Sequence, residues 1–311
     1  MRLKKGIEIL DYFFLLRPTL FYPIWTFFLA GCWGGMKFGV GASVFAHPAG
    51  PVWVALGLSL VMGSVFILNQ IQDAETDRVN GKLFLIANGI VSLKEAYTEA
   101  ILLGVCGLGI SFWIDIRVGL CLLVLLVLSG WLYNYPPAEW KDRPVMGIVT
   151  NAVGGLIIYC LGWMTGGGAG IVPLRAAAYT LAGAAVFLNT TLPDIEGDEK
   201  TGKITFGVRY GIERTAIWAL ILETITVGLA LLFRDWLLFI PGFLVFPFFI
   251  LGAMKRTMAE VLWATKFSVL ALAAAVCIFF PWYLLPVFFV FFFSKWYYKK
   301  RFNFDYPSFK S

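Results

Sequence analysis

Ten apolar stretches, each of roughly twenty residues, constrain this chain most, because a helix needs about that length to cross a bilayer. They cover residues 19–40, 52–70, 96–114, 117–135, 145–165, 174–193, 214–233, 236–254, 261–280 and 282–298. Only 14% of the residues are charged, against about 25% in soluble domains. The sequence therefore predicts an integral membrane protein, with a single domain over residues 1–311.

The expected fold class is all-α, a polytopic transmembrane helical bundle. Pro281 divides the last apolar region, so its two stretches are either two spans or one span and a surface segment. If the N-terminus is cytoplasmic, all 25 basic residues except Lys37, Arg117, Arg175 and Arg234 fall on the cytoplasmic side. This matches the positive-inside rule. The net charge of +6 is then explained by topology, and we expect no nucleic-acid partner.

Small residues recur at helical spacing in two of the apolar stretches. Gly31-x3-Gly35 and Gly162-x3-Gly166 match the pattern that lets transmembrane helices pack closely. In a chain with 32 glycines the match is weak, and tight packing within the bundle explains it.

Histidine and cysteine are too few or too scattered to form a familiar metal site or triad. His47 is the only histidine and lies in a loop rich in glycine and proline. The cysteines lie in or beside apolar stretches without paired spacing: Cys32, Cys106, Cys121, Cys160 and Cys277.

An acidic motif follows the apolar run 52–68. Asn69, Asp73 and Asp77 are four residues apart, a spacing that places them on one face of a helix. Glu75 points elsewhere. Carboxylates at the end of a membrane span are costly unless something cationic meets them.

A second acidic motif, Asp194-Ile-Glu-Gly-Asp198, follows the apolar run 176–192. In the predicted topology both motifs lie at the cytoplasmic ends of spans, as does the loop from Tyr133 to Arg143. The two motifs could therefore face each other across a cavity.

Two carboxylate patches without histidine favour a hard cation such as Mg²⁺, which commonly bridges carboxylates to substrate phosphates. A diphosphate leaving group would need that metal and nearby basic side chains, and an aromatic face such as Tyr133 could stabilise an allylic cation. Candidate metal ligands are Asn69, Asp73, Asp77, Asp194 and Asp198. Candidate substrate-binding residues are Arg17, Asn69, Arg78, Lys82, Lys141 and Lys203.

Four segments in this order resemble the motifs of the UbiA family of intramembrane prenyltransferases. They are Leu16-Arg17-Pro18, Asn69-x3-Asp73-x3-Asp77, the tyrosine–proline–lysine segment Tyr133 to Lys141, and the stretch from Leu192 to Gly211. The resemblance implies an all-helical bundle, usually of nine spans with a tenth possible here, around a central cavity with a cytoplasmic cap. It also implies Mg²⁺ as cofactor and catalytic roles for Asp73, Asp194, Tyr133 and Lys141.

The sequence departs from the family after its first acidic motif. Many members continue with an Arg-Pro pair, whereas this chain has Asn80-Gly-Lys82. Lys82 would then be the remaining positive charge in that segment.

We expect an enzyme of the cell inner membrane, with its active site toward the cytoplasm and membrane lipid around it. It would move a polyprenyl group from a diphosphate donor to an aromatic or other lipid-soluble acceptor. The second acidic motif and the Tyr-Pro-Pro segment look closer to members that use homogentisate, chlorophyllide or prenylglycerol phosphate. Two alternatives stay open: an ion-coupled membrane transporter, and a non-catalytic relative that binds prenyl lipids.

Overall fold

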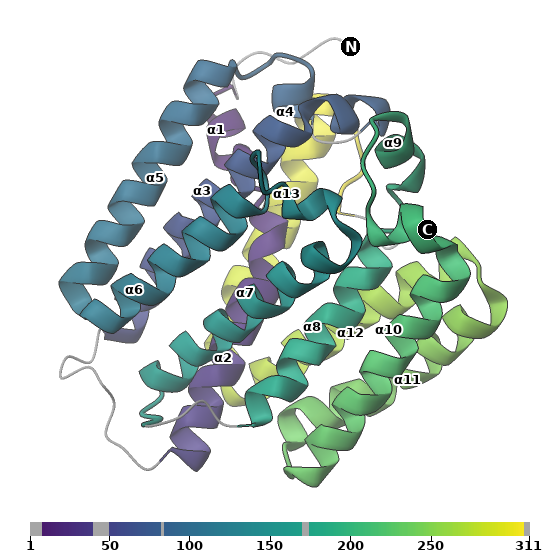
Figure 1. Cartoon of the computed structure of the whole chain (residues 1–311). Coiled ribbons are helices and arrows are strands. Elements are labelled where there is room, and N and C mark those ends of the chain that lie inside the picture. Colours follow the sequence, from purple (N-terminus) through teal and green to yellow (C-terminus); the bar gives the residue numbers. More distant parts are fainter. Residues whose placement is uncertain (1–7, 40–49, 82–83, 170–173, 308–311) are drawn as a thin grey trace.

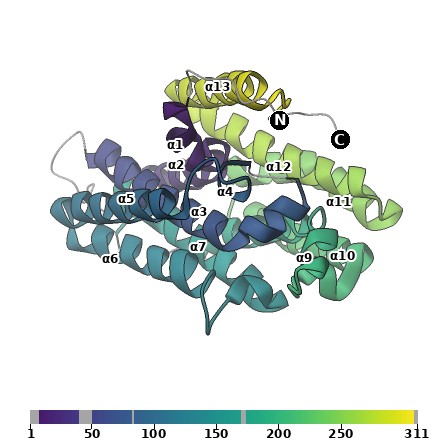
Figure 2. The ribbon, with the colours of Figure 1, turned by 90° about the horizontal axis from the view of Figure 1, so that it is seen from above.

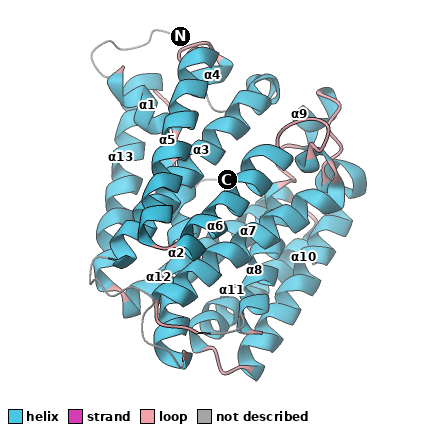
Figure 3. Ribbon diagram, turned by 60° about the vertical axis from the view of Figure 1, so that its left-hand side comes forward, coloured by secondary structure: helices cyan, strands magenta, loops and turns pink. Residues whose placement is uncertain are grey.

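The computed structural model describes residues 8–39, 50–81, 84–169 and 174–307. Within these ranges the chain is helical, without strands, and its long helices run side by side (Figures 1 and 3). The α-helices are α1 (Ile9–Leu15), α2 (Phe21–Phe38), α3 (Gly50–Val79), α4 (Phe84–Ala87), α5 (Leu93–Ile114), α6 (Ile116–Leu125), α7 (Pro144–Thr165), α8 (Arg175–Thr190), α9 (Ile195–Lys200), α10 (Phe206–Leu232), α11 (Trp236–Lys255), α12 (Met258–Phe279) and α13 (Leu284–Phe302). Short 3₁₀ turns are η1 (Pro18–Leu20), η3 (Trp140–Asp142) and η4 (Pro281–Tyr283), and η2 (Leu126–Leu132) is a π-helical continuation of α6.

Each of the ten predicted apolar stretches is mainly helical over its described residues, which confirms the all-α fold class. Seven helical segments among the described residues are long and apolar enough to cross a membrane: Ile9–Phe38, Gly50–Val79, Leu93–Ile114, Pro144–Thr165, Phe206–Leu232, Trp236–Lys255 and Met258–Phe279. The segment Ile116–Leu132 is apolar but shorter, and α8 has 16 residues. The predicted tenth stretch is α13, whose last turn carries Lys299, Lys300 and Arg301.

Six helices form a closed ring of neighbours. In order of contact these are α2, α7, α8, α10, α11 and α12, and α12 packs back against α2. The helices α3, α5 and α6 form a second group, joined to the ring through contacts of α3 with α2 and of α6 with α7. Seen from above, α5 and α6 lie on one side of the bundle and α9, α10 and α11 on the other (Figure 2).

The two glycine motifs meet each other where α2 crosses α7. A Cβ atom added to Gly31 would lie 2.1 Å from the backbone oxygen of Tyr159, and one added to Gly162 would lie 1.9 Å from the backbone oxygen of Phe28. Both distances are far below van der Waals contact, so only glycine permits this approach. The match that was weak in the sequence thus marks a helix–helix interface.

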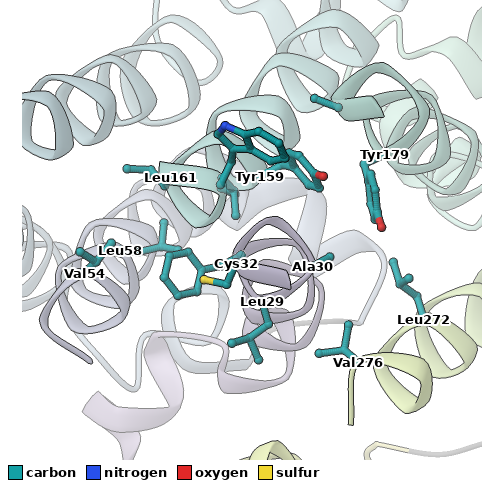
Figure 4. Close-up of a cluster of buried hydrophobic side chains, with 14 of the residues drawn as sticks. Leu29, Ala30, Cys32, Val54, Leu58, Tyr159, Leu161, Tyr179, Leu272 and Val276 are labelled. Atoms are coloured by element: carbon teal, nitrogen blue, oxygen red, sulfur yellow. The ribbon is translucent and has the colours of Figure 1, made fainter. Parts of the chain in front are cut away.

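The largest group of buried apolar side chains surrounds α2. Leu29, Ala30 and Cys32 are at most 5% exposed. Figure 4 shows them enclosed by side chains of α3, α7, α8 and α12. Helix α2 is therefore an interior member of the bundle, in contact with both groups of helices.

A buried ion pair joins the two ends of the described chain. The guanidinium of Arg301 on α13 donates to both carboxylate oxygens of Asp11 on α1, at 2.7 and 3.1 Å. The hydroxyl of Tyr297 donates to the same carboxylate at 2.6 Å, and the Tyr297 ring stacks on Phe14. These contacts hold α13 against α1.

We expect Gly162→Ala to lower the free energy of unfolding by about 1–3 kcal/mol, the usual cost of overpacking a close interface. The added methyl group must push α2 and α7 apart. The measurement is the midpoint of thermal unfolding in detergent. Gly228→Ala is the matched control, because no atom lies within 4 Å of its Cβ position in α10. Equal midpoints for the two variants would contradict this account of the interface.

Candidate active site

A cavity of about 830 Å³ opens among the helices of the ring and α3. Both predicted acidic motifs line it. Its remaining walls are largely apolar, with Phe27, Ile158 and Leu272 among them. Charged and polar residues gather near the end of α3 and the start of α9: Arg17, Asn69, Asp73, Asp77, Lys141, Asp142, Asp194, Asp198, Lys203 and Thr205.

Asp73 is the centre of the polar network. Helix α3 continues to Val79, so the first motif is helical throughout and Asn69, Asp73 and Asp77 all line the cavity. The ammonium group of Lys141 donates to Asp73 Oδ1 at 2.6 Å, and that of Lys203 donates to the same oxygen. Asn69 donates to Asp73 Oδ2 at 2.7 Å. Asp73 thus connects α3 with two distant loops.

The loop that carries Lys141 is held by a buried asparagine. Asn134 donates to the backbone oxygens of Ser129 and Gly130 at 2.9 and 3.0 Å, and its side-chain oxygen accepts from Asn69 at 3.0 Å. The backbone N–H of Lys141 donates to the Tyr133 carbonyl. The turn is therefore fixed with Lys141 and Tyr133 both on the cavity wall.

The second motif packs directly against the end of α3. A Cβ atom on Gly197 would lie 2.2 Å from the Asn80 side-chain oxygen, so with glycine at this position the Asn80 side chain can pack directly against α9. The hydroxyls of Thr76 and Thr201 share a hydrogen bond at 3.1 Å across the same contact. The two acidic motifs are thus brought to one cavity by direct packing.

Burial and neighbouring charges shift the pKa values of Asp198 and Lys203. Burial raises the pKa of Asp198 to about 6, although Lys203 and a 3.1 Å hydrogen bond from Thr205 stabilise its charged form. Burial opposes the charge on Lys203, but the nearby Asp73 carboxylate outweighs it and raises the pKa of Lys203 above its usual value. At neutral pH the lysine is cationic and Asp198 is mostly ionised.

Asp77 has unused bonding capacity. Its residue is 9% exposed, and its Oδ2 atom is buried without a hydrogen-bond partner among the described residues. The Asp77 carboxyl group interacts electrostatically with the charges of Asp73, Arg17 and Asp194. A buried carboxylate oxygen without a partner is costly, so this atom suits a ligand that the structure does not contain.

The carboxylates do not form a closed protein cage for a metal. Among the described residues, no three His, Cys, Asp or Glu side chains lie together as a ready metal site. Mg²⁺ usually keeps several waters and takes one or two carboxylates together with substrate phosphates. An open arrangement with the free Asp77 oxygen fits that mode of binding.

One predicted substrate-binding residue, Arg78, is not brought to the cavity. Arg78 pairs with Glu75 at 2.8 Å, donates to the Ala87 carbonyl, and has a side chain that is 59% exposed. It is not part of the cavity wall. Lys82 lies outside the described residues.

Sequence reasoning missed Asp142. It follows Lys141 directly, lines the cavity, and has a buried Oδ1 atom without a hydrogen-bond partner among the described residues. Burial raises its pKa above the ordinary value. The sequence feature that could have indicated Asp142 is its position directly after Lys141, a candidate phosphate-binding residue, in the loop that follows the span 117–135.

Comparison with known proteins places the chain among prenyltransferases. The model of the UbiA prenyltransferase family matches residues 25–260. A digeranylgeranylglyceryl phosphate synthase of Methanoculleus marisnigri is 31% identical over 208 residues, which cover 65% of this chain and 73% of that protein. A homogentisate phytyltransferase of Synechocystis is 28% identical over 193 residues, covering 54% of this chain and 58% of the relative. A probable homogentisate phytyltransferase of Oryza sativa matches over 45% of its own length.

Solved structures share the fold. A UbiA homologue from Archaeoglobus fulgidus, solved with GPP and Mg²⁺, superimposes with a TM-score of 0.66 at 24% identity. The match covers 86% of this chain and 98% of that one. A UbiA homologue from Aeropyrum pernix gives a TM-score of 0.64 at 16% identity. These likenesses confirm the predicted bundle, and, with the family model matched over residues 25–260, the chain belongs to the UbiA prenyltransferase family.

Proposed function

We propose that this protein is a Mg²⁺-dependent intramembrane prenyltransferase that transfers a polyprenyl group from its diphosphate to an aromatic or other lipid-soluble acceptor. The observation that carries this is the convergence of both acidic motifs, Lys141 and Lys203 at one end of a cavity whose other walls are largely apolar. The charged end suits a metal and diphosphate, and the apolar walls suit an isoprenoid chain. The family assignment favours this enzyme over a transporter.

The residues that would hold the metal are those of the two motifs: Asn69, Asp73, Asp77, Asp194 and Asp198. Bound Mg²⁺ would neutralise charge that develops on the departing diphosphate. Lys141, Lys203 and Arg17 would bind diphosphate oxygens as point charges. Both lysines already lie at Asp73, so little movement is needed to share them with a substrate.

In the transfer step, the bond between the first prenyl carbon and the diphosphate oxygen breaks, and diphosphate leaves with the electron pair. The acceptor nucleophile then bonds to that carbon and loses its proton. The face of the Tyr133 ring would stabilise the allylic cation. The apolar walls would keep water from capturing it.

The orientation that we propose places the charged end of the cavity toward the cytoplasm of the cell inner membrane, as the distribution of basic residues predicts. We treat residues 1–311 as one functional unit, since the cavity is lined from Arg17 to Tyr306. The relatives suggest two acceptor classes, a prenylglycerol phosphate and homogentisate.

The first test is diphosphate release by the purified protein in detergent. Geranylgeranyl diphosphate would be offered with geranylgeranylglyceryl phosphate, homogentisate or a chlorin acceptor, with Mg²⁺ or with a chelator. We expect Mg²⁺-dependent release with one acceptor class. Donor binding without product from any acceptor would instead indicate the non-catalytic prenyl-lipid-binding alternative.

Asp73→Asn should lower kcat by at least about 100-fold, because it removes a metal-binding charge that also positions two lysines. The measurement is diphosphate release at saturating donor, with thermal unfolding to show that the bundle is intact. Glu75→Gln is the control, as Glu75 lies on the same helix with a side chain that is 69% exposed. A wild-type rate in Asp73→Asn would end the proposal.

Lys203→Met should weaken binding of geranylgeranyl diphosphate by about 10–100-fold, the loss expected for a charged hydrogen bond of roughly 1.5–3 kcal/mol. Equilibrium binding in the presence of Mg²⁺ gives the dissociation constant. Lys200→Met is the matched control, because Lys200 is a neighbouring lysine whose exposed side chain pairs with Glu196. Equal losses in both variants would point to general electrostatics and not to a specific contact.

A further inference from the structure

A single carboxylate lines the cavity deep within the membrane-spanning part of α10. Glu223 is 3% exposed and belongs to the cavity wall. It lies twelve residues beyond Gly211, where a φ of 70° interrupts the regular helix. At 1.5 Å per residue this places it about 18 Å along the axis from that point. Glu223 therefore belongs to neither of the two acidic motifs.

Glu223 has no hydrogen bond or ion pair in the part of the chain that the structure describes. Two other buried acidic residues away from the charged end of the cavity are partnered: Asp11 is paired with Arg301 and Tyr297, and Asp235 accepts from Tyr179. An unpartnered acidic group within a membrane protein is expensive. The presence of such an acid on the cavity wall therefore indicates that it contacts a molecule bound in the cavity.

The neighbouring helix α11 lies close to this carboxyl group at a residue without a side chain. A Cβ atom on Gly242 of α11 would lie 3.3 Å from Glu223 Oε1. Pro241 and Gly242 both line the cavity at this point, so no long side chain of α11 arises there to cover the acid. Glu223 belongs to the cavity wall, so a ligand that enters the cavity can reach its side chain.

We propose that Glu223 is a specificity-determining residue that binds a hydroxyl group carried by a substrate at this depth. This inference rests on the proposed function, since it requires a long lipid substrate in the cavity. The hydroxyl would donate to the Glu223 carboxyl group and satisfy it. A plain hydrocarbon at the same place would displace water and leave the group without a partner.

The hydroxyl can belong to the donor chain or to the acceptor, and two sets of probes separate these sources. The first set is geranyl, farnesyl and geranylgeranyl diphosphate, each with and without a hydroxyl on its terminal isoprene unit. The second set is long-chain terminal diols and the corresponding mono-alcohols, which lack diphosphate. Binding of each probe is measured to the full chain in detergent with Mg²⁺.

We expect the wild-type protein to bind the hydroxylated member of one pair about ten-fold more tightly, the effect of one satisfied hydrogen bond. Glu223→Leu should abolish or reverse this preference by tightening binding of the plain chain. Glu223→Gln should retain it, because the amide still accepts a hydrogen bond. Thr226→Val is the control, as Thr226 is buried one turn along α10 but is not part of the cavity wall.

A preference among the diphosphates assigns the hydroxyl to the donor, and one among the diols alone assigns it to the acceptor. The same preferences in Glu223→Leu as in wild type would overturn the inference, as would the absence of any preference in wild type. Failure of every diphosphate to bind with Mg²⁺ would count against the proposed function. In that case the diols would still test Glu223 by itself.

Discussion

The arrangement of the active site depends on the ionic contacts of one carboxylate, Asp73. Its two oxygens receive hydrogen bonds from Asn69, Lys141 and Lys203. Lys203 is 130 residues away in sequence, so this single side chain joins the end of α3 to the loops after η2 and α9. Without these contacts, two buried lysines beside the cavity would lose their direct ion-pair partner, which is unfavourable.

The helices around the cavity approach one another closely at other points. Glycine residues, which have no side chain, lie where α2 meets α7 and where α9 meets the end of α3. In a membrane the hydrophobic effect contributes little to helix association, and close packing has to replace it. Close contacts between neighbouring helices therefore hold the bundle together around a largely apolar space, which a bulky substrate can fill.

Hydropathy located the helices because a bilayer requires long apolar runs, and four-residue spacing placed the first motif on one helix face. The same helix geometry argues against the prediction that Arg78 binds the substrate. It is five residues from Asp73 and so lies about 140° away around the helix, where it pairs with Glu75. Pairings between distant segments, such as Asp11 with Arg301, leave no local pattern. Glu223 was missed because one acid hardly alters the average of a long apolar stretch.

The charges at the polar end explain why a divalent cation belongs there. Five described lining carboxylates gather at that end, against three basic side chains: Asp73, Asp77, Asp142, Asp194 and Asp198, with Arg17, Lys141 and Lys203. This excess of negative charge would repel a diphosphate in a cavity of low dielectric constant. One divalent cation compensates two such charges, so we infer that the metal is needed for donor binding as well as for bond breaking. The lysines at Asp73 then lower the cost of burying the carboxylates while the metal is absent.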